Sequence, residues 1–99
     1  KGSYGNLRFF GEEAFQQMLP RPITEVVGHQ AAHEYGLGLV WCKSDGLGEG
    51  TFCHGAAPGA TYRIDPEHDL VIVMTRNAKG RNMAKYYPAF PRAVVAALE

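Results

Sequence analysis

Hydrophobic and polar positions alternate along the second half of the chain in a way that predicts short β-strands. Period-two alternation over residues 60–64 indicates a half-buried strand. Residues 70–74 are apolar on both faces, as expected of a central strand covered on both sides. The polar stretch 65–69 predicts a hairpin turn between these strands, and residues 51–57 predict a strand that precedes them. A tight turn over Ala57–Ala60, with Pro second and Gly third, joins that strand to the next.

The same alternation extends over Tyr35–Lys43 and predicts a further strand, followed by a turn-rich connection over residues 44–50. Gly36 and Gly38 lie on one face of this strand, where they would let another segment pack closely. Together the patterns predict an antiparallel meander of about four short strands.

Apolar residues at helical spacing predict a helix at each end of this meander. The first covers residues 11–19 and ends before Pro20 and Pro22. The second lies within 83–98, where two prolines either confine regular helix to about 90–98 or kink a longer one. Residues 23–34 predict a loop with at most one helical turn. The fold class expected is therefore α+β.

Composition places the chain among ordinary globular proteins. Its 99 residues make one domain or part of one, with formal net charge zero and pI about 7.1. A balanced charge predicts no attraction to nucleic acid or anionic membrane, and no apolar run approaches the roughly 20 residues of a membrane span. No signal segment opens the chain, and no Met precedes Met18. We therefore expect a piece of a longer protein, a processed chain or a trimmed one.

Cysteine and histidine spacing leaves two alternatives open. Cys42 and Cys53 either act as small buried hydrophobes or face each other across a hairpin, so their redox state stays undecided. His29 and His33 stand at i, i+4 and could join these cysteines and His54 in a zinc site. The cysteine spacing is not that of a zinc pair, so we expect no metal and no cofactor, with a zinc module as a weaker alternative.

His54 stands before a cluster of small residues, which is the strongest candidate for a site. Small side chains let a ligand approach the backbone, and an imidazole at the edge of such a stretch suits a hydrolase. Arg63, Asp65 and Arg76 are expected at the surface or in turns, with Asp65-Pro66 shaping the hairpin. Core or sheet-face packing is expected for Tyr62, Trp41 and Phe52.

Three pieces in order, Tyr35–Leu39, His54–Ala56 and Asp65–Asn77, resemble a known family. They are similar to the C-terminal end of serine β-lactamase-like proteins, which include class C β-lactamases, D-alanyl-D-alanine peptidases and related esterases. The resemblance is clearest over 35–98. It implies that residues 1–99 are a single partial domain, the C-terminal portion of a larger β-lactamase/transpeptidase-like domain. It also implies a bacterial protein, whether periplasmic, secreted or cytoplasmic.

The resemblance assigns roles to four consecutive residues. Family members carry Lys-Thr-Gly as their third motif, and many relatives carry His-x-Gly instead. By that alignment His54 stands at the Lys position, Gly55 at the Thr position and Ala56 at the Gly position. The backbone N–H of Ala57 then contributes to the oxyanion hole, so His54 and Ala57 are the catalytic candidates and Gly55 and Ala56 the substrate-binding ones. Gly55 lacks the Thr hydroxyl and Ala56 adds a methyl, which favours an esterase-like relative over a β-lactamase.

The family's Ser-x-x-Lys nucleophile motif is absent from the sequence. Tyr4-Gly5-Asn6 matches the family's Tyr-x-Asn string, but it stands too close to His54 to enclose the intervening helical domain. The function expected is that of the C-terminal part of a serine hydrolase acting on an ester or amide, inactive alone. The alternative is a structural or interaction module without catalysis. The partners implied are the missing N-terminal part of the parent protein or a second copy of the chain.

Overall fold

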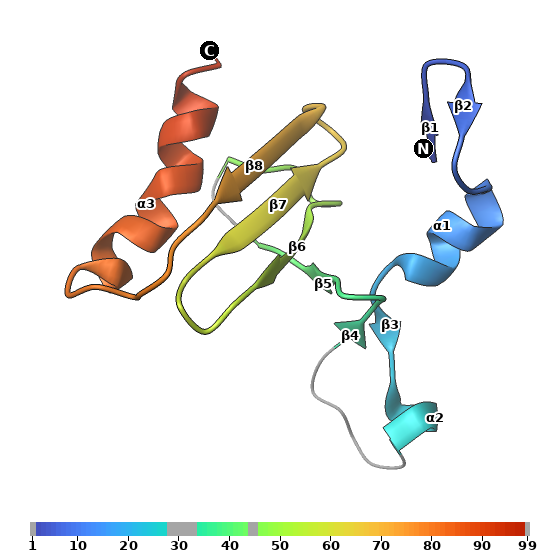
Figure 1. Ribbon diagram of the computed structural model, residues 1–99, viewed down its shortest axis with the longest axis horizontal. Coiled ribbons are helices and arrows are strands. Elements are labelled where there is room, and N and C mark those ends of the chain that lie inside the picture. The colour runs from blue at the N-terminus through green and yellow to red at the C-terminus, as the bar shows by residue number, and fades with distance from the viewer. Residues whose placement is uncertain (1, 28–33, 44–45, 99) are drawn as a thin grey trace. The chain divides into compact units, whose positions relative to one another are not determined.

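The computed structural model describes residues 2–27, 34–43 and 46–98 and has the predicted α+β fold (Figure 1). Its contacts divide the chain into two compact units, Lys1–Val40 and Trp41–Glu99. The elements in chain order are β1 (Ser3–Tyr4), β2 (Leu7–Arg8), α1 (Glu12–Met18), β3 (Arg21–Pro22), α2 (Thr24–Val27), β4 (Glu34–Tyr35), β5 (Val40–Trp41), β6 (Phe52–Gly55), β7 (Thr61–Asp65), β8 (Leu70–Met74) and α3 (Met83–Ala96).

The first unit is built from short hairpins around α1. Strands β1 and β2 pair antiparallel, as do β3 and β4. Helix α1 confirms the helix predicted over 11–19, with Glu12 and Glu13 in its first turn, where acids complement the helix dipole. Helix α2 is the single helical turn expected after residue 23, and residues 28–33 of that predicted loop lie outside the described residues.

The strand predicted over Tyr35–Lys43 is wrong, because this segment forms two strands in different sheets. Tyr35 belongs to β4, which pairs with β3, whereas β5 joins the four-stranded sheet. Between them the chain turns back, with the Gly36 N–H donating to the Leu39 carbonyl at 2.8 Å and Gly38 at φ +70°. A Cβ at Gly36 would collide with the Met18 carbonyl oxygen, so the glycines that fitted a strand pattern instead permit a turn.

The larger sheet has the order β5-β6-β7-β8, and its last three strands run antiparallel. The predicted meander is therefore confirmed. Two rows of cross-strand partners define its faces: Cys53, Arg63 and Ile72 on one, and His54, Tyr62 and Val73 on the other.

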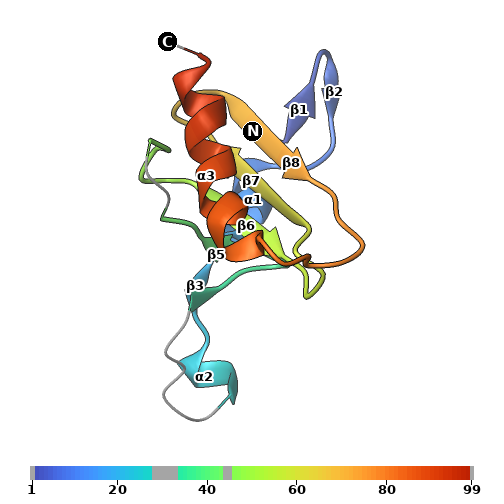
Figure 2. The same cartoon turned by 90° about the vertical axis from the view of Figure 1, so that its left-hand side faces the viewer.

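Helix α3 packs against the face that carries Arg63. The Tyr87 ring lies 5.1 Å from the Arg63 guanidinium carbon, and Figure 2 shows α3 in front of the sheet. Of the two predicted alternatives, the longer helix is present, with Pro88 and Pro91 inside it. Arg63 is buried against α3, which corrects the prediction that it lies at the surface or in a turn. Asp65 is also buried, but its carboxylate bonds the backbone of the turn that it was predicted to shape.

Strand β8 is an edge strand rather than the central strand predicted from its apolar sequence. Ile72, on the same face as Arg63, is buried, but Val71 and Val73 on the opposite face are 62% and 59% exposed. A continuous apolar run does not distinguish a strand covered on both sides from one whose second face is open. No helix within the described ranges is long and apolar enough to cross a membrane.

A disulfide joins Cys42 to Cys53 and resolves the alternative that the sequence left open. The two Cα atoms lie 5.8 Å apart, and the Cys42 N–H donates to the Thr51 carbonyl at 2.9 Å. The bridge therefore fastens the end of β5 to the start of β6, directly before His54.

Candidate functional site

A cavity of about 230 Å³ opens at the end of the large sheet where β6 leads into its turn and β8 ends. Its wall includes three of the four predicted site residues, His54, Gly55 and Ala56. The remaining lining residues are Ala60, Thr61, Tyr62, Val73, Met74 and Thr75. The structure therefore brings three of the four predicted site residues to one open, largely apolar cavity. Ala57 follows Ala56 in the sequence and does not itself line the cavity.

The turn after β6 starts one residue earlier than predicted. The Gly59 N–H donates to the Ala56 carbonyl at 2.8 Å, and the Ala56 N–H donates to the Ala60 carbonyl at 2.9 Å. Gly59, at φ +95°, is the last residue of a three-residue hairpin loop. A glycine is therefore found at the last position of the loop, where the chain must adopt a positive φ. The predicted turn over Ala57–Ala60 is wrong by one position, because the observed turn covers Ala56–Gly59.

The backbone N–H of Ala57 is left without a partner by this turn. No acceptor within 2–27, 34–43 or 46–98 takes its hydrogen bond, and Ala57 is exposed. Its nitrogen is covalently bonded to the carbonyl carbon of Ala56, which lines the cavity. A preorganised N–H beside a hollow is the kind of donor that stabilises a developing oxyanion.

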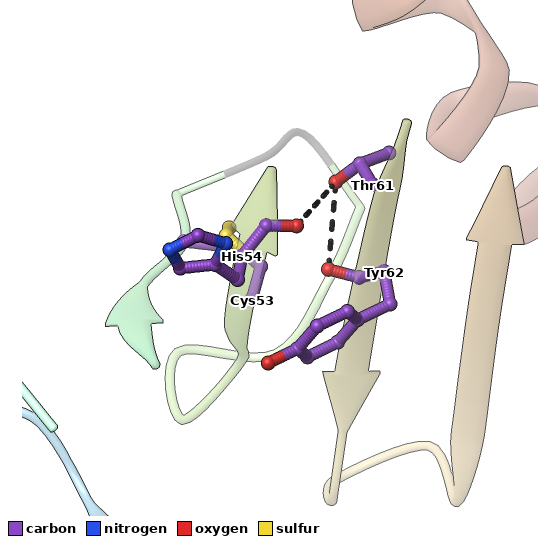
Figure 3. The surroundings of a disulfide bond; sticks show 5 residues. Cys53, His54, Thr61 and Tyr62 are labelled. Carbon is purple, nitrogen blue, oxygen red and sulfur yellow. Dashed lines mark hydrogen bonds between the residues drawn. A yellow bond between two sulfur atoms is a disulfide. The ribbon is translucent and has the colours of Figure 1, made fainter. Parts of the chain in front are cut away.

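The backbone of His54 is held in place, while its imidazole is exposed. The Thr61 hydroxyl donates to the His54 carbonyl at 3.0 Å, and the Tyr62 carbonyl lies 3.5 Å from the same hydroxyl (Figure 3). In the described part of the chain no side chain forms an ion pair or hydrogen bond with the imidazole. His54 can therefore contact a bound substrate, but none of the described carboxylates orients its ring as in a catalytic triad.

Gly55 and Ala56 differ in what surrounds them. Gly55 lies on the face covered by α3, and a Cβ there would be 3.5 Å from the Tyr87 hydroxyl, an ordinary contact. Space alone therefore does not require glycine at this position. Ala56 instead faces the cavity opening at the start of the turn, with both its N–H and its carbonyl bonded.

Asp65 and His68 form a second polar cluster, of which the sequence predicted only the role of Asp65 in shaping the turn. Asp65 is 1% exposed, and its carboxylate accepts hydrogen bonds from the Gly48 N–H at 2.9 Å, the Glu67 N–H at 3.0 Å and the His68 N–H at 3.3 Å. The His68 Nδ1 lies 2.7 Å from the same carboxylate. An Asp-Pro-x-His turn was the available signal, because Asp side chains commonly bond the backbone of their own turn.

Electrostatics within this cluster favour the charged forms of both side chains. Burial alone would raise the pKa of Asp65, but its hydrogen bonds from Gly48, His68 and Glu67 outweigh burial and lower it. The hydrogen bond to Asp65 raises the pKa of His68, and burial opposes this only in part. With its oxygens occupied by these donors, Asp65 fastens the loop around Gly48 to the turn after β7.

The zinc alternative loses its cysteine ligands, because a disulfide sulfur is not a thiolate. Within the described ranges no three His, Cys, Asp or Glu side chains converge as metal ligands would. His29 and His33 lie outside the described residues.

Comparison with models of known protein families, with curated proteins and with solved structures finds no match to this chain. The resemblance to serine β-lactamase-like proteins therefore stays a prediction.

Proposed function

We propose that this chain forms the C-terminal part of a serine hydrolase of the β-lactamase, peptidase and esterase type. In this proposal it supplies one wall of an acyl-transfer site, and the nucleophilic serine comes from outside residues 1–99. The observation that carries the proposal is the cavity lined by His54, Gly55 and Ala56, with the unpartnered N–H of Ala57 beside it.

The chemistry follows from what these residues can do. Attack of a serine hydroxyl on an ester or amide carbonyl places negative charge on the carbonyl oxygen, and the Ala57 N–H would stabilise that charge. His54, exposed at the cavity, would contact the substrate or assist proton transfer. Gly55 has no hydroxyl to bind a substrate carboxylate, which favours an ester over a β-lactam.

The test uses the natural protein that contains residues 1–99 and a chromogenic p-nitrophenyl ester. We expect a stoichiometric burst of nitrophenol, blocked by a fluorophosphonate that labels a serine outside this chain. Replacing Ala57 by Pro removes the N–H and should lower kcat about 10²- to 10³-fold. Ala57→Gly keeps the N–H and should recover most of that loss.

Two results contradict the proposal. One is the absence of any burst or labelled serine in the natural protein. The other is equal activity in Ala57→Pro and Ala57→Gly, which would show that the N–H is not used.

A second candidate is an interaction module, and one observation favours it. Strand β8 presents an unpaired edge and two exposed valines, Val71 and Val73, and it contains no charged residue to block pairing. A second copy of the chain could pair with β8 antiparallel about a two-fold axis and extend the sheet.

Sedimentation equilibrium of the chain distinguishes this candidate. If β8 mediates self-association, the chain is a dimer and Val73→Lys makes it monomeric, because a lysine on the edge strand opposes pairing. Val26→Lys is the matched control, since Val26 is 84% exposed and lies in α2. A monomer at every concentration contradicts this candidate.

A further inference from the structure

The zero net charge of the chain conceals a strong separation of charge. Between residues 70 and 98 the sequence contains no Asp or Glu. The basic residues in this stretch are Arg76, Lys79, Arg81, Lys85 and Arg92. Acidic residues elsewhere in the chain balance these cations. The prediction that the chain does not attract an anionic surface considered only its net charge and not where the charges lie.

The structure gathers these cations at one end of the second unit. Four of them stand in the segment that leaves β8 at Met74 and enters the first turn of α3, and Lys79, Arg81 and Lys85 are exposed. The first turn of α3 contains no acid, so the positive end of the helix dipole adds to their field. We call residues 76–85 the basic end.

Acidic residues lie at the opposite end of the same strand. Strand β8 starts at Leu70, directly after the turn that carries Glu67 and Asp69, and it ends at Met74, where the basic end begins. A five-residue strand is about 16 Å long. That span exceeds the Debye length of about 8 Å at physiological ionic strength, so the acids do not neutralise the basic end.

Helix α3 continues the basic end along its outer face. Lys85 and Arg92 stand seven residues apart and therefore on the same side of the helix, with Ala89 and Ala96 beside them. All four are exposed, whereas Tyr87 contacts Arg63 of the sheet and Pro91 is buried. Tyr86, on the flank of the outer face, is 55% exposed. Small residues between the cations let this face approach a flat surface closely, and an exposed tyrosine suits a headgroup region.

We propose that the basic end and the outer face of α3 bind a surface of anionic phospholipid headgroups. Four of the five cations are exposed, and together the five spread over a loop and the first turns of α3, which fits a planar array of charge rather than one small anion. The Cys42–Cys53 disulfide is typical of an oxidising compartment, where nucleic acid is scarce and membrane surfaces are present. Because the cavity and the basic end share the same end of β8, binding holds the cavity toward the membrane.

Co-sedimentation of the chain with lipid vesicles tests this proposal independently of any hydrolase activity. The vesicles contain either phosphatidylcholine alone or an equal mixture with phosphatidylglycerol, at about 50 mM and about 500 mM NaCl. We expect binding only to the mixed vesicles at low salt. Arg81→Gln with Lys85→Gln should weaken the partition coefficient about 30-fold, since each cation near an anionic surface contributes about fivefold.

Arg8→Gln with Lys43→Gln is the matched control, because it removes the same charge from exposed positions outside the basic end. This control should change binding less than about threefold. Equal losses in the two double variants, equal binding to both kinds of vesicle, or no binding at low salt would overturn the proposal. So would binding of a short single-stranded DNA that displaces the chain from mixed vesicles at equal charge concentration.

Discussion

Two charged side chains on β7 are buried side by side on one face and are stabilised differently. Asp65 accepts hydrogen bonds from three backbone N–H groups and contacts the His68 ring. Arg63 is 5% exposed and stacks on Tyr87, but its Nε and Nη1 have no hydrogen-bond partner in the described part of the chain. Burial of a charge stabilises a fold only where its polar atoms are satisfied.

We therefore predict opposite outcomes for two substitutions on this strand. Asp65→Ala leaves the N–H groups of Gly48 and Glu67 unpaired and should lower the free energy of unfolding by about 2–4 kcal/mol. Arg63→Met keeps the length of the side chain, removes unsatisfied donors and should change it by under about 1 kcal/mol. Urea unfolding of both variants measures the difference, and a larger loss for Arg63→Met would show that the guanidinium is bonded.

The pair of His68 with Asp65 predicts a pH dependence of stability. Because the pKa of His68 is raised on folding, its stabilising contribution is complete below the unfolded value of about 6.5 and is lost as pH rises through the folded pKa. The pKa of Asp65 is lowered, so its contribution is lost only in strong acid, as pH falls through the folded value. The unfolding midpoint should therefore decrease as pH rises above about 6.5 and through the raised folded pKa of His68.

His68→Gln separates this effect from other titrations. The variant lacks the titrating ring, so its unfolding midpoint should stay level over the range in which the natural chain loses stability. His54, which is exposed, supplies the matched control, because His54→Gln should keep the slope. A slope that survives in His68→Gln would assign the pH dependence to another group.

At the scale of elements, the hairpin loop after β6 depends on one glycine. Gly59 has φ +95°, and a Cβ there would lie 2.8 Å from Met83 Cε. Gly59→Ala should therefore cost at least about 1–2 kcal/mol, from backbone strain and from displacing Met83. Gly50→Ala, which meets no atom within 4 Å and needs no positive φ, should be close to neutral. Thermal unfolding compares them, and equal midpoints would contradict the strain argument.

Periodicity predicted the elements better than it predicted their surroundings. The strands at 51–57, 60–64 and 70–74 and both terminal helices follow from local patterns, which short-range physics determines. The identity of the sheet face that α3 covers does not follow from these local patterns. Tyr62 and Ile64 form the apolar side of β7, yet the helix packs on the side of Arg63, which stacks on Tyr87. Asp65 on that same side is buried with its carboxylate bonded to the Gly48 loop and to its own turn.

The candidate site was predictable in its position but not in its details. The small residues after His54 indicated room beside a backbone, and three of the four predicted residues line the cavity. The one-residue shift of the turn depends on the hydrogen bonds of Ala56 with Gly59 and Ala60, and the positions of Pro and Gly in the sequence do not determine which residues pair in this way. The hydrogen bond between Asp65 and Gly48 could not be predicted from a local pattern either, because the two residues are 17 positions apart in the sequence.

At the scale of the whole molecule, the apolar core is small for a chain of 99 residues. Apart from prolines, the buried apolar side chains among the described residues are Leu39, Phe52, Cys53 and Ile72. Small chains with a limited core depend on cross-links, because burial alone offsets little more than the conformational entropy lost on folding. The Cys42–Cys53 disulfide closes a loop with a sequence separation of 11. Cys42 directly follows β5 and Cys53 lies in β6, so the bond links these two neighbouring strands.

Reduction of this disulfide should therefore remove a large share of the total stability. Loop closure at this length contributes about 3 kcal/mol, against the 5–15 kcal/mol typical of whole domains. Urea unfolding with and without a phosphine reductant measures the loss, and Cys42→Ser with Cys53→Ser should match the reduced chain and no longer respond to reductant. Since Cys53 directly precedes His54, loosening β6 should also increase amide exchange at His54 and Gly55 more than at α1 in the other unit. Equal increases in both units would mean that the bridge stabilises the chain through its unfolded state alone.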